Sequence, residues 1–184
     1  MALIFQYGSN VSVRRLNSRA RLRGDARMLG LVKTRGAFEL GFTVWSDQNG
    51  CAAADILPDG TRQIWGVLYQ VPDHLIRRET AGARRSFDAI ENEGAEYLRR
   101  SVAVSWPDGR PVEEEVQTYM VRDRRDGLRT ELHYVEHILT GLLECGAPED
   151  YVSYVGRRIV ANNPDLAGPL AAHFPGLPGA SACG

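Results

Sequence analysis

The tetrapeptide Tyr7-Gly8-Ser9-Asn10 combines residue types that can hold an anion or a developing oxyanion. Glycine lets the backbone approach a ligand closely or adopt a positive φ. Successive backbone N–H groups at a strand-to-helix turn can cradle negative charge, and the side chains of Ser9 and Asn10 add hydrogen bonds. Taken alone, these four residues fit an ordinary turn better, in which Ser9 or Asn10 only caps a helix.

A second candidate is the acidic segment 87–97, which holds four carboxylates followed by Tyr97. A carboxylate beside the apolar residues Phe87 and Ile90 can have a raised pKa and serve in proton transfer. Taken alone, this segment fits a solvated acidic turn between a helix and a strand better.

The first half of the chain predicts the elements that would position the tetrapeptide. Residues 3–7 are short, apolar and rich in strand formers, and a helix is expected to begin near Asn10 or Ser12. Residues 24–69 alternate apolar runs with turn clusters at 46–50 and 58–60, which is typical of consecutive antiparallel strands. The apolar run 64–71 predicts a central strand.

The second half of the chain predicts further helices, two paired strands and an irregular tail. The two strands are expected at 97–106 and 112–122. Helices are expected at 72–81, briefly at 86–91, at 130–145 and at 148–160. We therefore expect an α+β fold with a mixed, barrel-like β-sheet and flanking helices. One domain would span residues 1–162, and the Pro/Gly-rich residues 163–184 would form an irregular tail.

Composition excludes several classes of function. The net charge of −1, from 22 basic and 23 acidic residues, argues against a nucleic-acid surface. No apolar stretch approaches the roughly 20 residues needed to cross a membrane, and the start of the chain has no signal-peptide pattern. The three cysteines form no C-x-x-C pair, and His133 and His137 have no third ligand nearby, so we expect neither a metal site nor a redox motif. A cytoplasmic protein is the simplest interpretation.

The tetrapeptide and the acidic segment flank a third motif, Trp65-Gly66-Val67-Leu68-Tyr69. Together, and in this order, the three motifs resemble the γ-glutamylcyclotransferase-like family, which includes the AIG2-like proteins. The family begins with a short strand ending in Tyr-Gly-Ser-Asn and later carries a WGVLY-type strand. The resemblance covers roughly residues 2–160 and implies the γ-glutamylcyclotransferase-like fold.

The resemblance also implies a catalytic carboxylate, the Glu of the family's Leu-Asp-x-x-Glu-Gly segment. Residues 87–91 match that segment with Phe87 in the Leu position, which makes Glu91 the acid/base. Asn92 stands where the family has Gly. Glu93 is followed by Gly94 and so offers a literal Glu-Gly pair. We favour Glu91, because its spacing to Tyr97 suits the family, and Glu93 stays open as the alternative.

The reaction that the resemblance implies is an intramolecular aminolysis of a γ-glutamyl-amine or γ-glutamyl-amino acid, releasing 5-oxoproline and a free amine. It implies neither metal nor cofactor. The loop from Tyr7 to Asn10 would bind the small-molecule substrate, with Tyr97, Arg99 and Tyr119 as further pocket residues. The alternative function is a non-catalytic small-molecule-binding protein on the same fold. The oligomeric state is left open.

Overall fold

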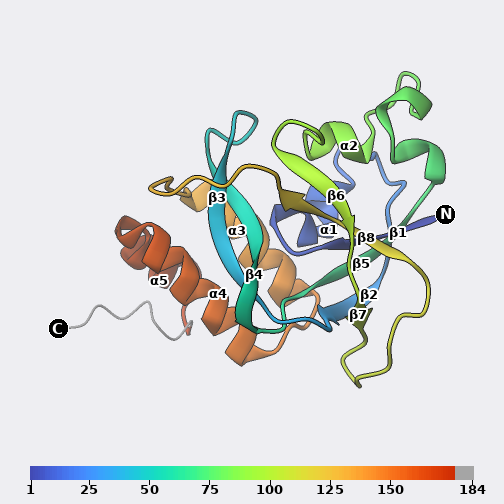
Figure 1. The fold of residues 1–184 in the computed structure, drawn as a ribbon. Coiled ribbons are helices and arrows are strands. Elements are labelled where there is room, and N and C mark those ends of the chain that lie inside the picture. The colour runs from blue at the N-terminus through green and yellow to red at the C-terminus, as the bar shows by residue number, and fades with distance from the viewer. Residues whose placement is uncertain (177–184) are drawn as a thin grey trace.

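The structure is a computed structural model that describes residues 1–176, with the side chain of Asp59 excepted. It is an α+β fold with a curled sheet and flanking helices, as the sequence predicts (Figure 1). The strands are β1 (Ala2–Gln6), β2 (Arg27–Thr34), β3 (Phe38–Ser46), β4 (Cys51–Arg62), β5 (Trp65–Val71), β6 (Tyr97–Ser101), β7 (Val104–Ser105) and β8 (Val116–Val121). The helices are α1 (Val13–Leu16), α2 (Phe87–Ile90), α3 (Leu132–Glu144), α4 (Glu149–Asn162) and α5 (Ala167–His173), with 3-10 turns η1 (Ser9–Val11), η2 (Asp73–Leu75), η3 (Arg78–Thr80) and η4 (Pro164–Leu166).

Six strands form one mixed sheet in the order β6-β8-β1-β5-β2-β7. Strand β1 is antiparallel to β5, with Ile4 opposite Tyr69, and parallel to β8, with Ile4 opposite Gln117. Both β1 and β5 are mostly buried, which matches their apolar sequences. Because β1 is paired on both sides, the segment that follows it, from Tyr7 onward, begins at the end of a central strand.

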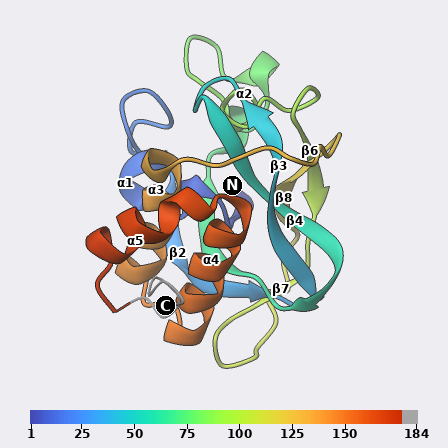
Figure 2. The same cartoon turned by 90° about the vertical axis from the view of Figure 1, so that its left-hand side faces the viewer.

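The long hairpin β3–β4 forms a separate two-stranded ribbon. It lies between the helices α4 and α5 on one side and the six-stranded sheet on the other (Figures 1 and 2). Polar contacts fasten α4 to β3: the Leu40 N–H donates to the Tyr154 hydroxyl at 2.9 Å, and Arg158 Nε donates to the Leu40 carbonyl at 2.8 Å. The ribbon therefore joins the sheet to the C-terminal helices.

Three sequence predictions about local structure are wrong. The helix expected at 72–81 is two 3-10 turns, because the Thr80 hydroxyl donates to the His74 and Arg77 carbonyls and so takes acceptors that an α-helix would use. The turn expected at 58–60 lies inside β4, where the pairing register with β3 shifts. The tail expected to be irregular forms η4 and α5, since Leu166 and Leu170 are four residues apart and both are buried. The rest of that tail, 177–184, lies outside the described residues.

Within residues 1–176 no helix is long and apolar enough to cross a membrane. The same residues contain no group of three or more His, Cys, Asp and Glu side chains placed to hold a metal ion.

Candidate active site

The chain leaves β1 at Gln6 and enters the tight turn η1, which puts the tetrapeptide at the end of the first strand as predicted. Gly8 has an ordinary φ of −92°, so conformational freedom does not explain the glycine. Close packing does: a Cβ at this position would lie 3.3 Å from Ala54 Cβ and 3.5 Å from the Tyr134 hydroxyl. Ser12 then caps α1 by accepting a hydrogen bond from the Arg15 N–H at 3.3 Å.

Three buried tyrosines fix the walls around this turn. The Tyr97 hydroxyl donates to the Ala54 carbonyl at 2.8 Å, and the Ala54 N–H donates to the Tyr134 hydroxyl at 2.9 Å. The Tyr7 hydroxyl donates to the Tyr119 carbonyl at 2.6 Å. These bonds connect β1, β4, β6, β8 and α3 around one point. Burial raises the pKa values of the Tyr7 and Tyr97 phenols well above their ordinary value, so both stay neutral donors.

Glu91 comes to the same point from the other side, as the residue that ends α2. The helix starts at Ser86, whose hydroxyl accepts from the Ala89 N–H at 3.1 Å, and Phe87 and Ile90 anchor it in the core. Asn92 follows with a φ of +48°, a left-handed conformation that Asn and Gly adopt most readily. The Gly that the family has at this position would adopt the same left-handed conformation.

The Glu91 carboxylate meets the tetrapeptide directly. Asn10 Nδ2 donates to Glu91 Oε1 at 2.7 Å. The tetrapeptide and Glu91 also line one cavity of about 20 Å³, which is room for about one water molecule. Its walls are formed by Gln6, Tyr7, Gly8, Ser9, Asn10, Ala54, Glu91, Tyr97, Tyr119 and Tyr134.

The electrostatics around Glu91 favour proton exchange. Burial raises the pKa of the Glu91 carboxyl above its ordinary value, while the positive charge of Arg21, the hydrogen bond from Asn10 and the charge of Arg15 act in the opposite direction. Arg21 does not touch the carboxylate: its guanidinium donates to Asn10 Oδ1 at 3.1 Å. Asn10 therefore links Arg21 to Glu91 through two hydrogen bonds. Glu91 itself forms no direct ion pair with a cation among the described residues.

The family model described as the AIG2-like family matches residues 63–155, about half of the chain. The chain belongs to the AIG2-like family. No curated protein matches it in a sequence comparison.

Solved structures share the fold of this AIG2-like chain. A structure titled "Gamma-glutamyl cyclotransferase" aligns with a TM-score of 0.69 at 19% identity, covering 84% of this chain and 86% of that one. An uncharacterized protein from Homo sapiens aligns with a TM-score of 0.68 at 20% identity, covering 84% and 86%. YkqA from Bacillus subtilis aligns with a TM-score of 0.67 at 19% identity, covering 88% of this chain and 55% of that one. At these identities the likeness concerns the fold, and it agrees with the fold that the sequence predicts.

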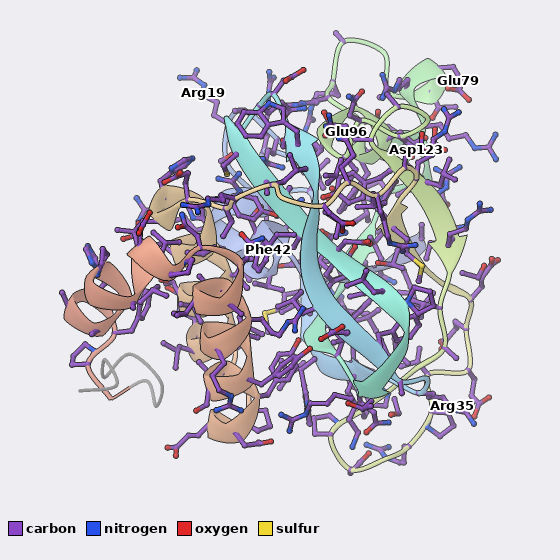
Figure 3. All side chains as sticks on the ribbon, turned by 60° about the vertical axis from the view of Figure 1, so that its left-hand side comes forward. Arg19, Arg35, Phe42, Glu79, Glu96 and Asp123 are labelled. Atoms are coloured by element: carbon purple, nitrogen blue, oxygen red, sulfur yellow. The ribbon has the colours of Figure 1, made fainter. Side chains whose placement is uncertain are left out.

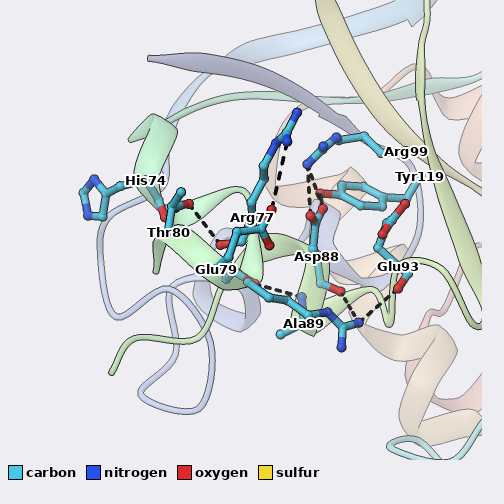
Figure 4. A network of polar contacts seen from close by, with 11 residues as sticks. His74, Arg77, Glu79, Thr80, Asp88, Ala89, Glu93, Arg99 and Tyr119 are labelled. Carbon is cyan, nitrogen blue, oxygen red and sulfur yellow. Dashed lines mark hydrogen bonds and ion pairs between the residues drawn. The ribbon is translucent and has the colours of Figure 1, made fainter. Parts of the chain in front are cut away.

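The structure brings most of the sequence-predicted site residues of this AIG2-like protein together. The tetrapeptide, Glu91, Tyr97 and Tyr119 all line the cavity. Neither Arg99 nor Glu93 does. Arg99 instead pairs with the buried Asp88, its Nη1 lying 2.9 and 3.1 Å from the two carboxylate oxygens (Figure 4).

Tyr119 has two roles that follow from its position on β8. Tyr119 lines the cavity and its backbone carbonyl accepts from the Tyr7 hydroxyl, while its own hydroxyl donates to Asp88 Oδ1 at 2.7 Å (Figure 4). The ring stacks on Phe87 with centroids 5.4 Å apart. Tyr119 and Arg99 together hold Asp88, and Asp88 in turn fixes α2 and therefore Glu91.

Sequence reasoning missed Tyr134, Arg15 and Arg21. Tyr134 lies in the predicted helix α3 and was not distinguishable there from a core aromatic. Arg15 and Arg21 are both partly buried, and arginines at such spacings usually lie on solvated helix faces. The available signal was their place in an arginine-rich stretch, 14–21, directly after the tetrapeptide.

Proposed function

We propose that this protein is a γ-glutamylcyclotransferase-type enzyme, which releases 5-oxoproline and a free amine from a γ-glutamyl-amine or γ-glutamyl-amino acid. The observation that carries the proposal is the hydrogen bond of 2.7 Å between Asn10 of the first-strand loop and the partly buried carboxylate of Glu91. Membership of the AIG2-like family supports it.

The reaction needs no external nucleophile. The α-amine of the γ-glutamyl group attacks the γ-carbonyl carbon, a C–N bond forms within a five-membered ring, and the original amide C–N bond breaks. The leaving nitrogen receives a proton and departs as an amine. The protein has to fold the glutamyl chain into attack geometry. The α-nitrogen has to lose one proton before it attacks and a second as the ring forms, and one of these protons passes to the leaving nitrogen.

Glu91 is the proposed acid/base. The α-ammonium group must lose a proton before it can attack, and the same carboxyl can return that proton to the leaving nitrogen. A carboxyl works best in both directions when its pKa lies nearer to neutrality than in water, and burial raises the pKa of Glu91 in that direction.

The loop from Tyr7 to Asn10 is the proposed binding site for the glutamyl end. Backbone N–H groups of this turn could stabilise the oxyanion that develops on the γ-carbonyl oxygen. The cavity of about 20 Å³ holds about one water molecule. A glutamyl chain is larger, so binding requires the side chains around Glu91 to move apart, a change of the kind that many enzymes undergo on substrate binding.

The test is the conversion of γ-glutamyl-alanine to 5-oxoproline and alanine, followed by chromatography of both products. Turnover is expected to fall by about 10²- to 10⁴-fold in Glu91→Gln, because the amide cannot accept the proton. The matched control is Glu93→Gln, a change of the same kind two residues away that does not alter the cavity wall.

Opposite outcomes for the two variants would show that Glu93 is the acid/base. No turnover of γ-glutamyl-alanine, of γ-glutamyl-lysine isomers or of simple γ-glutamyl-amines by the unchanged protein would overturn the enzymatic proposal. It would favour the alternative, a non-catalytic binding protein on this fold.

A further inference from the structure

A groove lined by basic side chains begins beside the Glu91 cavity. Its volume is about 900 Å³, and it is bounded by the segment around α1, the turn between β3 and β4, and the exposed face of α3. Its walls carry the arginines Arg14, Arg15, Arg21 and Arg85 and the histidines His133, His137 and His173. Asn10 connects the two spaces, because it lines the cavity and accepts a hydrogen bond from Arg21 of the groove at 3.1 Å.

The guanidinium groups of this groove bind only neutral acceptors. Arg15 Nη2 donates to Asn49 Oδ1 at 2.6 Å, and Arg85 donates to the Gln48 side-chain oxygen and to the Ala20 carbonyl. Neither forms an ion pair with any carboxylate that the structure describes. Arg15 Nε is in addition buried without a hydrogen-bond partner among the described atoms. A buried donor left unpaired costs free energy unless a ligand or water satisfies it.

The neighbouring residues neutralise this charge only in part, because four arginines and two glutamates line the groove. Glu136 lies 3.3 Å from His173, and Glu144, the last residue of α3, is exposed to solvent. The pKa of His137 falls to about 4 through burial and the charges of Arg15 and Arg21, so this imidazole is neutral at pH 7. The pKa of Arg21 falls to about 10 through burial and the charge of Arg15, which leaves it cationic.

The charges in the groove can be counted. Arg21 is directed at Asn10 and thereby offsets the nearby Glu91 carboxylate. Arg14 and Glu144 also line the groove, but both are exposed, so water screens their charges. Arg15 and Arg85 remain, which are two partly buried cations without an ion-pair partner in the described structure. A guanidinium is suited to bind carboxylate or phosphate oxygens through paired hydrogen bonds. Two such groups facing one groove match a ligand with two negative charges.

We propose that this groove binds the amine portion of the substrate and that this portion carries two negative charges, as a phosphomonoester or as two carboxylates. The inference rests on the proposed function, since it assigns the part of the γ-glutamyl conjugate that leaves as the free amine. The anionic groups take no part in the bond changes: the amide C–N bond still breaks and the nitrogen still receives the proton. Their role is to hold the leaving portion while the glutamyl end occupies the Glu91 cavity.

The experiment compares kcat/KM for four γ-glutamyl conjugates that differ in the leaving amine. They are the conjugates of ethanolamine (uncharged), alanine (one carboxylate), aspartate (two carboxylates) and O-phosphoethanolamine (one phosphomonoester). The two doubly charged conjugates are expected to exceed the ethanolamine conjugate by about 10- to 100-fold, the effect of a hydrogen bond to a charged group. Whichever of these two conjugates has the higher kcat/KM shows whether the groove prefers a phosphomonoester or two carboxylates. The advantage should shrink in high salt.

Variants assign this preference to the groove. Arg15→Gln and Arg85→Gln are each expected to narrow the ratio between doubly charged and uncharged conjugates by about tenfold. Arg19→Gln is the control: Arg19 is exposed, belongs to the same arginine-rich segment, does not line the groove and points away from the molecule (Figure 3). Thermal unfolding checks each variant, and the more accessible Arg85 keeps the test decisive if Arg15→Gln does not fold.

A binding measurement separates this inference from the proposed function. The same four compounds are titrated by calorimetry into Glu91→Gln, which lacks the proposed acid/base. Turnover without a preference for charged conjugates would overturn the proposed role of the groove and leave the proposed enzymatic activity intact. Suppose instead that the conjugates bind according to their charge, that Arg85→Gln removes this binding, and that the unchanged protein shows no turnover. This result would support the proposed role of the groove and overturn the proposed enzymatic activity. No binding and no turnover, or a charge preference that every arginine variant retains, would overturn the inference.

Discussion

Two carboxylates of one short helix have opposite environments. Asp88, in the first turn of α2, is buried and fully partnered: Arg99 binds both of its oxygens and the Tyr119 hydroxyl binds one. Glu91, three residues later, receives one hydrogen bond, from Asn10, and no direct cation among the described residues. Asp88 is held in place as a structural anion. Glu91 is left with capacity to exchange a proton, and the anchored Asp88 fixes where Glu91 stands.

The difference predicts a large loss of stability at Asp88. Asp88→Ala removes the acceptor of Arg99 and Tyr119, whose side chains then stay partly buried without their partner; the side chains of the ion pair are only 8% and 17% exposed. Breaking a buried pair by removing one partner costs about 3 kcal/mol or more of unfolding free energy. Urea denaturation followed by circular dichroism measures it.

The companion change is Glu91→Gln, which should leave the free energy of unfolding unchanged or slightly increased. Partial burial disfavours the ionised form of Glu91 and so raises its pKa, and glutamine can still accept a hydrogen bond from Asn10. Equal destabilisation by the two changes would contradict the division between a structural and a reactive carboxylate.

The sequence predicted the parts of this site that are local. The tetrapeptide follows β1, and Glu91 follows a capped apolar turn, because strand, turn and cap signals act over a few residues. The order of the motifs pointed to Glu91, and its meeting with Asn10 depends on α2 packing against the loop. Arg99 was expected in the pocket because the family resemblance implies it, whereas its pairing with Asp88 could not be predicted from the sequence.

The remaining parts depend on contacts that no local pattern encodes. The backbone of Ala54 is hydrogen-bonded to Tyr97 of β6 and to Tyr134 of α3. Ala54 and Tyr134 are 80 residues apart in the chain. Arg21 reaches Asn10 through a coil segment after α1, and Arg85 reaches the groove from a different loop. Such a groove is assembled by the fold, so the sequence alone does not show that these arginines lie together.

A smaller effect is expected at Asn92, which sets the backbone between the two alternative glutamates. Its φ of +48° costs a residue with an ordinary Cβ about 1 kcal/mol or slightly more. Asn92→Ala should therefore destabilise the fold by about that amount, whereas Asn92→Gly should stay within about 0.5 kcal/mol. Denaturant unfolding of both variants measures the difference. Equal stabilities for the two would show that the left-handed backbone is not maintained in solution.

The subtlest test concerns the pH dependence of turnover. The proposed base must be ionised to accept a proton, so kcat/KM should fall as the pH drops through the pKa of Glu91. That acidic limb should lie above the ordinary range of a glutamate, because burial raises this pKa. The nearby charge of Arg21 lowers it, so Arg21→Gln should move the limb to still higher pH, while Arg19→Gln should leave it in place. A limb that moves to lower pH in Arg21→Gln would mean that the group seen in the profile is not a carboxyl stabilised by that cation, and the assignment of Glu91 as the base would fall with it.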